Sequence, residues 1–407
     1  MSTLRIGIVG CGVAGMTAAI LLSEAGHAVT LLERFETPQP LGAGLLIQPT
    51  GLRVLQRLGV HDDALKSGAR VAGIDGRSDL GHSVLDLRYG DLDSRLHGLG
   101  LHRGALFTLL FDRLGRAPAT LVTGFGVASI RDNTLATADG RAAGPFDLVL
   151  VCDGAHSRLR ESLAPKHRAP TYAWGCFWAT LPDPERRFAG LLRQRFRGNR
   201  HMVGVLPVGI APGGDDNDDV TLFWSLRVAE MAAVRARGLG PLRTVLLDIW
   251  PELAPLLESL TSFDQFSDAT YRDVVMSGFR RERILFLGDC AHGMSPQLGM
   301  GANLALADAA TLAGALARTG SLDAAITLFE QTRKRTLSLY SFVSRWLTPF
   351  YQGDAVAVGW LRDLTFGPAC VFPPTRRAML TMLSGTRRDW FETFPIAGDG
   401  LPDLPLI

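Results

Sequence analysis

The 407-residue sequence has few lysines, no closely spaced cysteine pair and no long apolar segment, and each shortage excludes a class of protein. Its 42 basic residues include only three lysines (Lys66, Lys166 and Lys334), an arginine bias typical of a GC-rich genome. Against them stand 40 acidic residues, which leaves a net charge of +2. This balance argues against a nucleic-acid-binding protein, which needs a strong excess of positive charge.

The five cysteines are scattered along the chain, and none has the C-x-x-C spacing of a redox or zinc site. They predict neither a disulfide framework nor a metal centre, and a reducing cytoplasm is the expected compartment. No apolar run reaches the ~18 residues that cross a bilayer, although the mean hydropathy of +0.15 is high for a soluble enzyme. A strand that begins at residue 4 leaves no room for a signal peptide. We therefore expect a soluble, cytoplasmic protein.

The chain opens with a pattern typical of a dinucleotide-binding unit. An apolar run at residues 4–9 predicts a buried parallel strand, and a glycine-rich turn then leads into a helix that ends near Gly26. A second strand over residues 28–32 ends on Glu33. The glycine spacing alone is weak evidence, and an accidental turn is the alternative. Strand, turn, helix, strand and acid in this order make a nucleotide site the favoured interpretation.

Each glycine of this turn has its own predicted role. Gly10 makes the tight turn, Gly12 lets a pyrophosphate approach the bare backbone, and Gly15 allows the helix to pack closely on the strand. The amides of Val13 and Ala14, at the helix N-terminus, are expected to face the phosphates. Glu33 can accept hydrogen bonds from ribose hydroxyls and would repel a 2′-phosphate, and Arg34 beside it is a further predicted cofactor contact.

Two later strands also end on acidic residues. Residues 146–151 predict a buried strand before Asp153 and Gly154, and residues 284–287 predict another before Gly288 and Asp289. Because ligands bind at the carboxyl ends of parallel strands, all three ends suit one extended ligand. Either aspartate alone could instead cap a helix.

Further residues extend this predicted site beyond the AMP half of a dinucleotide. Asp289 can accept a hydrogen bond from a polyol hydroxyl, and a helix starting near Gly301 would direct its N-terminus at the ligand. Arg103, at another helix start, could pair with a pyrophosphate. A flavin with its ribityl chain fits this set.

These stretches resemble those of the single-component FAD-dependent aromatic hydroxylases, the family of para-hydroxybenzoate, salicylate and ubiquinone-biosynthesis hydroxylases. The turn from Gly10 to Gly15 is similar to the first family fingerprint. Residues 147–158 are similar to the second, whose Asp-Gly pair the family associates with FAD and NAD(P)H. Residues 288–303 are similar to the third, which holds the ribityl chain and closes over the flavin ring.

The resemblance implies further cofactor contacts. Arg103 stands where the family has its pyrophosphate-binding arginine, and residues 42–49, with Gly44 and Gln48, resemble its flavin-adjacent loop. Met300 departs from the Gln or Lys of many members. Within the third fingerprint the implied contacts are Asp289, Pro296, Gly299, Met300, Gly301, Ala302 and Asn303.

The resemblance also implies an activity. The expected enzyme is an FAD-dependent monooxygenase that uses NADH or NADPH and O₂ to hydroxylate an aromatic substrate through a flavin C4a-hydroperoxide. The substrate would be phenol-like or heteroaromatic, including a lipophilic or polyketide-type ring. No second G-x-G-x-x-G occurs, so NAD(P)H is expected to bind only transiently. The alternatives are another flavoenzyme of the same fold (an epoxidase, halogenase or isoprenoid reductase) and a non-catalytic flavin-binding protein.

The rest of the chain predicts two further parts. Aromatic and Thr residues alternate with polar ones over residues 171–277, as in antiparallel strands with one covered face. The acidic run at residues 215–219 is expected to be a solvated hairpin tip rather than a cation site, and no metal site is predicted. The fold class is therefore α/β, with a Rossmann-like FAD-binding domain, an antiparallel β-sheet substrate domain and C-terminal helices. The expected bounds are 1–70, 101–168 and 278–322 for the first, 71–100 and 169–277 for the second, and 323–407 for the helices.

No catalytic residue can be named from the sequence. His201, Trp224 and Tyr271 lie in the predicted substrate sheet and are candidate substrate contacts, although each of these residues is more often a packing residue than a ligand. An apolar stripe from Leu339 to Phe350 is expected to dock on the FAD-binding domain, or else to face a lipophilic substrate or a membrane surface. A monomer or a homodimer is compatible with the sequence.

Overall fold

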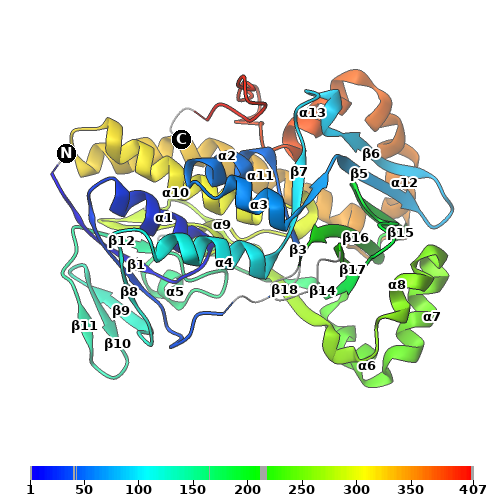
Figure 1. The fold of residues 1–407 in the computed structure, drawn as a ribbon, viewed down its shortest axis with the longest axis horizontal. Helices are drawn as coiled ribbons and strands as arrows, with labels where there is room; N and C mark the ends of the chain where they lie inside the picture. The colour runs from blue at the N-terminus through cyan, green and yellow to red at the C-terminus, as the bar shows by residue number, and fades with distance from the viewer. Residues whose placement is uncertain (1, 40–41, 43, 165, 211–217, 405–407) are drawn as a thin grey trace.

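The computed structural model describes residues 2–39, 42, 44–164, 166–210 and 218–404. Residue 43 of the predicted flavin-adjacent loop and residues 215–217 of the acidic run lie outside the described residues. The first of the two large sheets lies on the left in Figure 1. It is six-stranded, with the order β20–β21–β12–β1–β2–β8, and is parallel except for the edge strand β20. The strands are β1 (Arg5–Val9), β2 (Ala28–Leu32), β8 (Thr120–Val122), β12 (Leu148–Val151), β20 (Arg280–Arg281) and β21 (Ile284–Phe286).

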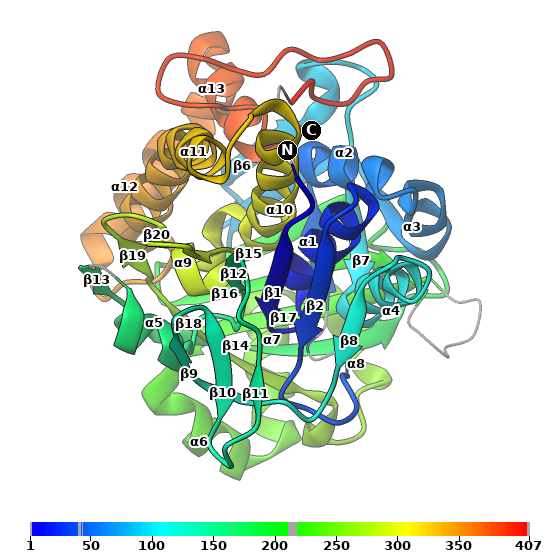
Figure 2. The ribbon, with the colours of Figure 1, turned by 90° about the vertical axis from the view of Figure 1, so that its left-hand side faces the viewer.

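Helices α1 (Val13–Glu24) and α10 (Gly301–Arg318) pack on each other beside this sheet (Figure 2). Both lack a polar face: α1 is buried from Ala14 to Ser23, and α10 from Asn303 to Leu316. A helix that is apolar all round must be covered on every side, and these two cover each other and the sheet. Their N-termini therefore come to the same edge, where the parallel strands end.

The second large sheet has the order β18–β14–β17–β16–β15–β5–β6 and is antiparallel except between β15 and β5. It thus unites strands from residues 73–88 with strands from residues 171–272. The domain bounds expected from the sequence stay a prediction. The strands are β5 (Gly73–Ser78), β6 (Ser83–Arg88), β14 (Thr171–Pro182), β15 (Leu191–Arg197), β16 (His201–Gly209), β17 (Asp219–Arg227) and β18 (Ser267–Arg272).

The two faces of this second sheet meet different partners. Phe177, Val203 and Trp224 pack with the helices α6 (Val228–Arg237), α7 (Leu239–Ile249) and α8 (Ala254–Glu258). Cys176, Met202 and Phe223 pack on the other face with α11 (Leu322–Tyr351) and α12 (Val356–Val371). Because successive strand residues point to opposite faces, the alternation in the sequence separates these two sets.

A third, smaller sheet has β7 (Gly98–His102) in its middle. Both β3 (Gly44–Ile47) and β4 (Ala69–Val71) pair with it. The remaining strands form two minor sheets. The other elements are α2 (Pro49–Arg57), α3 (His61–Ser67), α4 (Arg103–Leu114), α5 (Arg158–Leu163), α9 (Asp289–His292), α13 (Pro373–Leu383), β9 (Val127–Arg131), β10 (Thr134–Thr137), β11 (Ala142–Ala143), β13 (His167–Arg168) and β19 (Val275–Met276), with 3₁₀ turns η1 (Tyr89–Asp91), η2 (Pro251–Leu253), η3 (Phe263–Gln265) and η4 (Pro296–Leu298).

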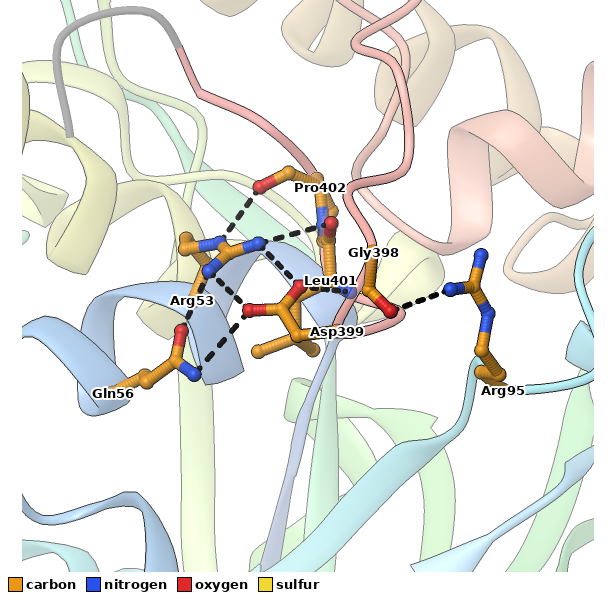
Figure 3. Close-up of polar contacts among 7 residues, drawn as sticks. All are labelled: Arg53, Gln56, Arg95, Gly398, Asp399, Leu401 and Pro402. Atoms are coloured by element: carbon orange, nitrogen blue, oxygen red, sulfur yellow. Dashed lines mark hydrogen bonds and ion pairs between the residues drawn. The ribbon is translucent and has the colours of Figure 1, made fainter.

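The C-terminal segment that follows α13 passes along α2, where Arg53 binds it through Asp399 (Figure 3). The Arg53 guanidinium donates two hydrogen bonds to the Asp399 carboxylate, at 2.7 and 2.8 Å, and also donates to the carbonyls of Leu401 and Pro402. Arg95 donates to the Gly398 carbonyl at 2.7 Å. This bidentate pair fixes the C-terminal segment against the helix that follows Gln48.

The apolar stripe on α11 is only partly covered. Leu339 is buried, and Val343 and Leu347 pack against the main core, whereas Phe342 and Trp346 are about half exposed. Helix α13 buries Leu380 and Leu383, so its apolar side already faces the protein. None of the helices in the described part of the chain has the length and hydropathy needed to cross a membrane.

Candidate functional site

The glycine-rich turn between β1 and α1 is held by close backbone contacts. Gly10 has φ of +101° and donates from its amide to the Leu32 carbonyl at 2.8 Å. A Cβ there would lie 2.7 Å from the Cys152 carbonyl oxygen, and a Cβ on Gly15 only 1.9 Å from the Gly10 carbonyl oxygen. These two glycines are therefore required by the protein itself.

Gly12 is different, because a Cβ placed there would meet no atom of the described residues within 4 Å. Its φ of −90° suits any residue, so neither strain nor packing requires glycine at this position. It precedes α1, whose N-terminus has no side-chain cap. The space beside Gly12 is thus an open cradle at a helix N-terminus, which suits a phosphate-bearing ligand.

Glu33 lies beside this turn and binds its backbone. The buried carboxylate accepts hydrogen bonds from the amides of Cys11, at 2.8 Å, and Phe35, at 3.0 Å. Burial, together with the Glu33 charge, raises the pKa of the Cys11 thiol to about 12 and keeps it protonated. The structure therefore gives Glu33 a loop-holding role that the sequence did not predict. Its remaining lone pairs stay available for ribose hydroxyls.

The end of β12 carries Asp153, whose Oδ1 is buried without a hydrogen-bond partner. Burial raises the pKa of this carboxyl, while the nearby Arg160 and Arg34 guanidinium groups act in the opposite direction. Gly154, with φ of +85°, borders open space. The Asp153 carboxylate has a hydrogen bond with Ser157, but its Oδ1 has no partner among the described residues, so it can accept from a ligand donor next to the open backbone.

The end of β21 brings Asp289 to the N-terminus of α10. A Cβ on Gly301 would lie 3.8 Å from Asp289 Oδ1, and one on Gly288 would lie 3.1 Å from the Cβ of Ala14. The Asp289 side chain is exposed, and α10 has no side-chain cap on its Met300 N-cap. Two uncapped helix N-termini and the acid thus lie at one edge of the parallel sheet.

Gln48 and Asn303 join the two loops at this edge. The Asn303 Oδ1 accepts from the Gln48 amide at 2.8 Å, and its Nδ2 donates to the carbonyls of Leu46 and Gly299, both at 3.0 Å. Tyr89 donates its hydroxyl to Gln48 Oε1, while Gln48 Nε2 is buried and has no partner. That Nε2 lies 3.9 Å from where a Gly299 Cβ would be. All polar atoms of the Asn303 side chain thus bind backbone groups. The side-chain Nε2 of Gln48 stays available as a donor for a ligand.

Sequence reasoning missed a buried ionic network behind this edge. Asp308 on α10 accepts from Arg333 Nε at 2.7 Å and from the Gly288 amide at 2.9 Å, and lies 2.5 Å from His292 Nε2. Burial opposes ionisation, but the charges of His292 and Arg333 hold the pKa of Asp308 at about 2. Asp308 is the one charged residue of α10 before Arg318. A single charge in an otherwise apolar helix was the sequence signal that could have predicted a buried ion pair.

The three predicted substrate residues are not brought together. Tyr271 lies on the sheet face that carries Phe223, and Trp178 Nε1 donates to its hydroxyl at 3.3 Å. Trp224 packs on the opposite face among the helices α6 to α8, and the His201 ring stacks on it at 6.0 Å. Trp224 therefore lies on the face opposite Tyr271, and a substrate contact by Trp224 or His201 stays a prediction.

Arg103 connects the two halves of the site. It begins α4, is exposed, and lies so close to Gly42 that a Cβ there would be 2.9 Å from Arg103 Cδ. Burial raises the pKa of Tyr271, and the Arg103 charge acts in the opposite direction. Gly44 touches the same sheet, since its Cβ would lie 2.5 Å from Thr221 Oγ1.

Comparison with known proteins now decides the family. The family model described as FAD binding domain matches residues 3–337. The chain belongs to this FAD-binding family. Its relatives include 3-amino-4-hydroxybenzoate 2-monooxygenase from Streptomyces cremeus, 29% identical over 382 residues, which covers 86% of this chain and 89% of that protein. Another, 6-hydroxynicotinate 3-monooxygenase from Pseudomonas fluorescens, is 27% identical over 364 residues and covers 84% and 90%.

Solved structures share the fold. The tetrameric form of 2-methyl-3-hydroxypyridine-5-carboxylic acid oxygenase matches with a TM-score of 0.77 and 21% identity, over 96% of this chain and 100% of that one. HpxO from Klebsiella pneumoniae, solved with FAD and uric acid, matches with a TM-score of 0.76 and 19% identity, over 94% and 97%.

The residues at the strand edge fit FAD. The open cradle at Gly12 has room for a pyrophosphate, and the uncapped helix N-termini offer amide donors to it. The orphaned Gln48 Nε2 supplies a donor, and Asp153 and Asp289 supply acceptors. A ligand that is anionic in its centre and polar at both ends matches this charge pattern.

Proposed function

We propose that this protein is an NAD(P)H-dependent FAD monooxygenase that hydroxylates an aromatic or heteroaromatic ring. One observation carries the proposal: an unpaired buried donor, Gln48 Nε2, and two uncapped helix N-termini share an edge that lies beside an aromatic sheet face. In this family-wide chemistry, bound FAD accepts hydride from NAD(P)H and activates O₂ for transfer of one oxygen atom.

The FAD contacts that we propose follow the three strand ends. Gly10, Gly12, Val13, Ala14 and Gly15 would surround the pyrophosphate with Arg103, and Glu33 and Arg34 would lie near the adenosine. Asp289 would hold the ribityl chain, and the α10 N-terminus would stabilise negative charge on the flavin ring. The remaining proposed contacts are Gly44, Gln48, Asp153, Gly154, Pro296, Gly299, Met300, Gly301, Ala302 and Asn303.

The protein would orient the ring substrate and exclude water. The rings of Trp178 and Phe223 lie 4.9 Å apart, tilted by 33°, and Tyr271 adds a phenol to the same face. Such a face suits a flat ring, and the Tyr271 hydroxyl can hydrogen-bond a ring substituent. Burial raises the pKa of Tyr271, so its phenol stays protonated and acts as a donor. A hydroxylated benzoate, pyridine or quinolone presents such a flat ring with a polar substituent.

The assignment is tested by oxygen-dependent turnover. We expect purified protein to be yellow, to release free FAD on acid denaturation, and to oxidise NADH or NADPH faster when the correct ring compound is added. The screen should cover phenols, pyridines, quinolones and polyketides, with mass spectrometry of the products. A product heavier by one oxygen atom is the expected result. NAD(P)H oxidation that no ring compound stimulates would contradict the proposal.

A further inference from the structure

Helix α12 is apolar on its outside and charged on its inside. Its exposed face carries Val356, Trp360, Leu361, Leu364 and Val371, continued by Phe372, each at least half exposed. Trp360 is 70% exposed and Leu364 is 74% exposed. The positions recur at helical spacing, and the only polar side chain among them is Thr365. In both views the helix lies on the outside of the molecule (Figures 1 and 2).

The only two charged residues of α12 are turned inward. Arg362 is fully buried and pairs with Asp363 at 2.6 Å, and it donates to the Phe350 carbonyl at 3.0 Å. Its guanidinium also lies 4.7 Å from the Phe196 ring centre. A helix that hides its charges and exposes its apolar side is the reverse of a solvated surface helix, so this face is built to be covered.

Its size and charge indicate what covers it. Each of these large half-exposed side chains offers on the order of 100 Å², so the face amounts to roughly 600 Å², close to the ~800 Å² that each partner buries in a standard interface. In a two-fold interface the same face of each copy meets the other, so any charged group on it would also need an opposite charge there. This face is uncharged and can pack against itself without such a match.

An anionic lipid surface is a poorer match, because most arginines at the two ends of α12 are already paired, and only the exposed Arg377 of α13 forms no ion pair with the described residues. Arg200 and Arg227 both bind Asp354 before the helix begins. Arg376 binds Asp91 beyond its end. Interfacial helices instead present unpaired Lys and Arg beside their apolar side.

We infer that the exposed face of α12 binds the same face of a second copy of this chain, which makes the protein a homodimer. The inference is independent of the proposed activity, since it uses no cofactor or substrate contact. It is tested with the full-length, FAD-loaded protein by sedimentation equilibrium. The expected mass is twice 43.9 kDa for wild type.

Leu364→Glu, which puts a charge in the centre of the face, should halve the measured mass, and Trp360→Ala should weaken the dimer in the same direction. Two controls should stay dimeric: Leu364→Met keeps the apolar area, and Ala232→Glu adds the same charge on an exposed position of α6. Flavin content should be unchanged in all four variants, because these side chains are exposed and none is a proposed FAD contact.

Three results would overturn the inference. A wild-type monomer at micromolar concentration would exclude the dimer, and a dimer that Leu364→Glu leaves intact would place the contact on another face. Co-sedimentation of wild type with phosphatidylglycerol vesicles, lost in Leu364→Glu, would assign the face to a bilayer.

Discussion

Asn303 and Gln48 are 255 positions apart in the sequence, yet the Asn303 carboxamide accepts the Gln48 backbone hydrogen bond at 2.8 Å. The same side chain donates both of its amide hydrogens to carbonyls of the two loops that border the proposed flavin site. Asn303 is therefore a positioning residue, which fixes where the unpaired Gln48 Nε2 lies. It stands near the start of α10, so one helix both presents its N-terminus and aligns the opposite loop.

Replacement of Asn303 by alanine is predicted to weaken FAD binding about 10- to 100-fold, because the Gln48 amide and the carbonyls of Leu46 and Gly299 lose their hydrogen bonds to its side chain. The affinity can be measured from the fluorescence of released FAD. Asn199→Ala is the matched control, since Asn199 is as buried and donates to two carbonyls, those of Pro349 and Ala355. It should lower the melting temperature and leave FAD affinity unchanged. Equal loss of FAD in both variants would refute the positioning role.

Gly12→Ala is predicted to abolish FAD retention while the protein folds normally. The new methyl group meets no atom of the described residues within 4 Å and can only collide with a ligand. Gly240→Ala, also in open space but on α7, should keep its flavin. Gly15→Ala should instead destabilise the fold itself, because its methyl group would strike the Gly10 carbonyl. A Gly12→Ala protein that purifies with full FAD would place the pyrophosphate elsewhere.

Asp289→Ala is predicted to weaken FAD binding by about 1–3 kcal/mol, the usual effect of losing a charge-assisted hydrogen bond. The side chain is exposed, so the melting temperature of the FAD-free protein should hardly change. Titration with FAD gives the affinity. Asp153→Ala should in addition slow reduction by NAD(P)H in stopped-flow measurements. If Asp289→Ala binds FAD as tightly as wild type, Asp289 serves only the local loop.

The buried Asp308 predicts a particular acid sensitivity. Its folded pKa of about 2 is depressed below the usual value of an aspartate. The stabilisation is therefore present above about pH 4 and is lost as the pH falls toward 2. This group should contribute on the order of 2 kcal/mol to that loss. The free energy of unfolding can be measured in urea at about pH 5 and about pH 3. At about pH 5, Asp308→Asn should be less stable than wild type, and its stability should fall less than that of wild type between the two pH values. An unchanged pH dependence would show that the pKa shift is absent.

Much of the fold was readable because its periodic patterns are strong. Residues 4–33 predicted β1, α1 and β2, and the runs before Asp153 and Asp289 predicted two more parallel strands. The aromatic alternation correctly predicted an antiparallel sheet over the middle of the chain. These patterns are local, so a single sequence contains them in full.

The rest of the site depended on contacts between distant segments. No pattern linked Gln48 to Asn303, Asp308 to Gly288, or Tyr89 to Gln48, because side-chain pairing across the fold is not periodic. Glu33 was expected to face only the ribose, whereas it also holds the amides of Cys11 and Phe35. The face on which Trp224 lies depended on strand register, which a shift of one residue reverses.

We propose that this chain transfers one atom of O₂ to an aromatic ring at an FAD site on the edge of the parallel sheet. The most direct measurement is mass spectrometry of the product formed under isotopically labelled O₂, with wild type and Gly12→Ala compared. We predict one labelled oxygen atom per product molecule for wild type and no product for Gly12→Ala. A product whose new oxygen comes from water, or NAD(P)H oxidation that yields only hydrogen peroxide with every ring compound, would contradict the account.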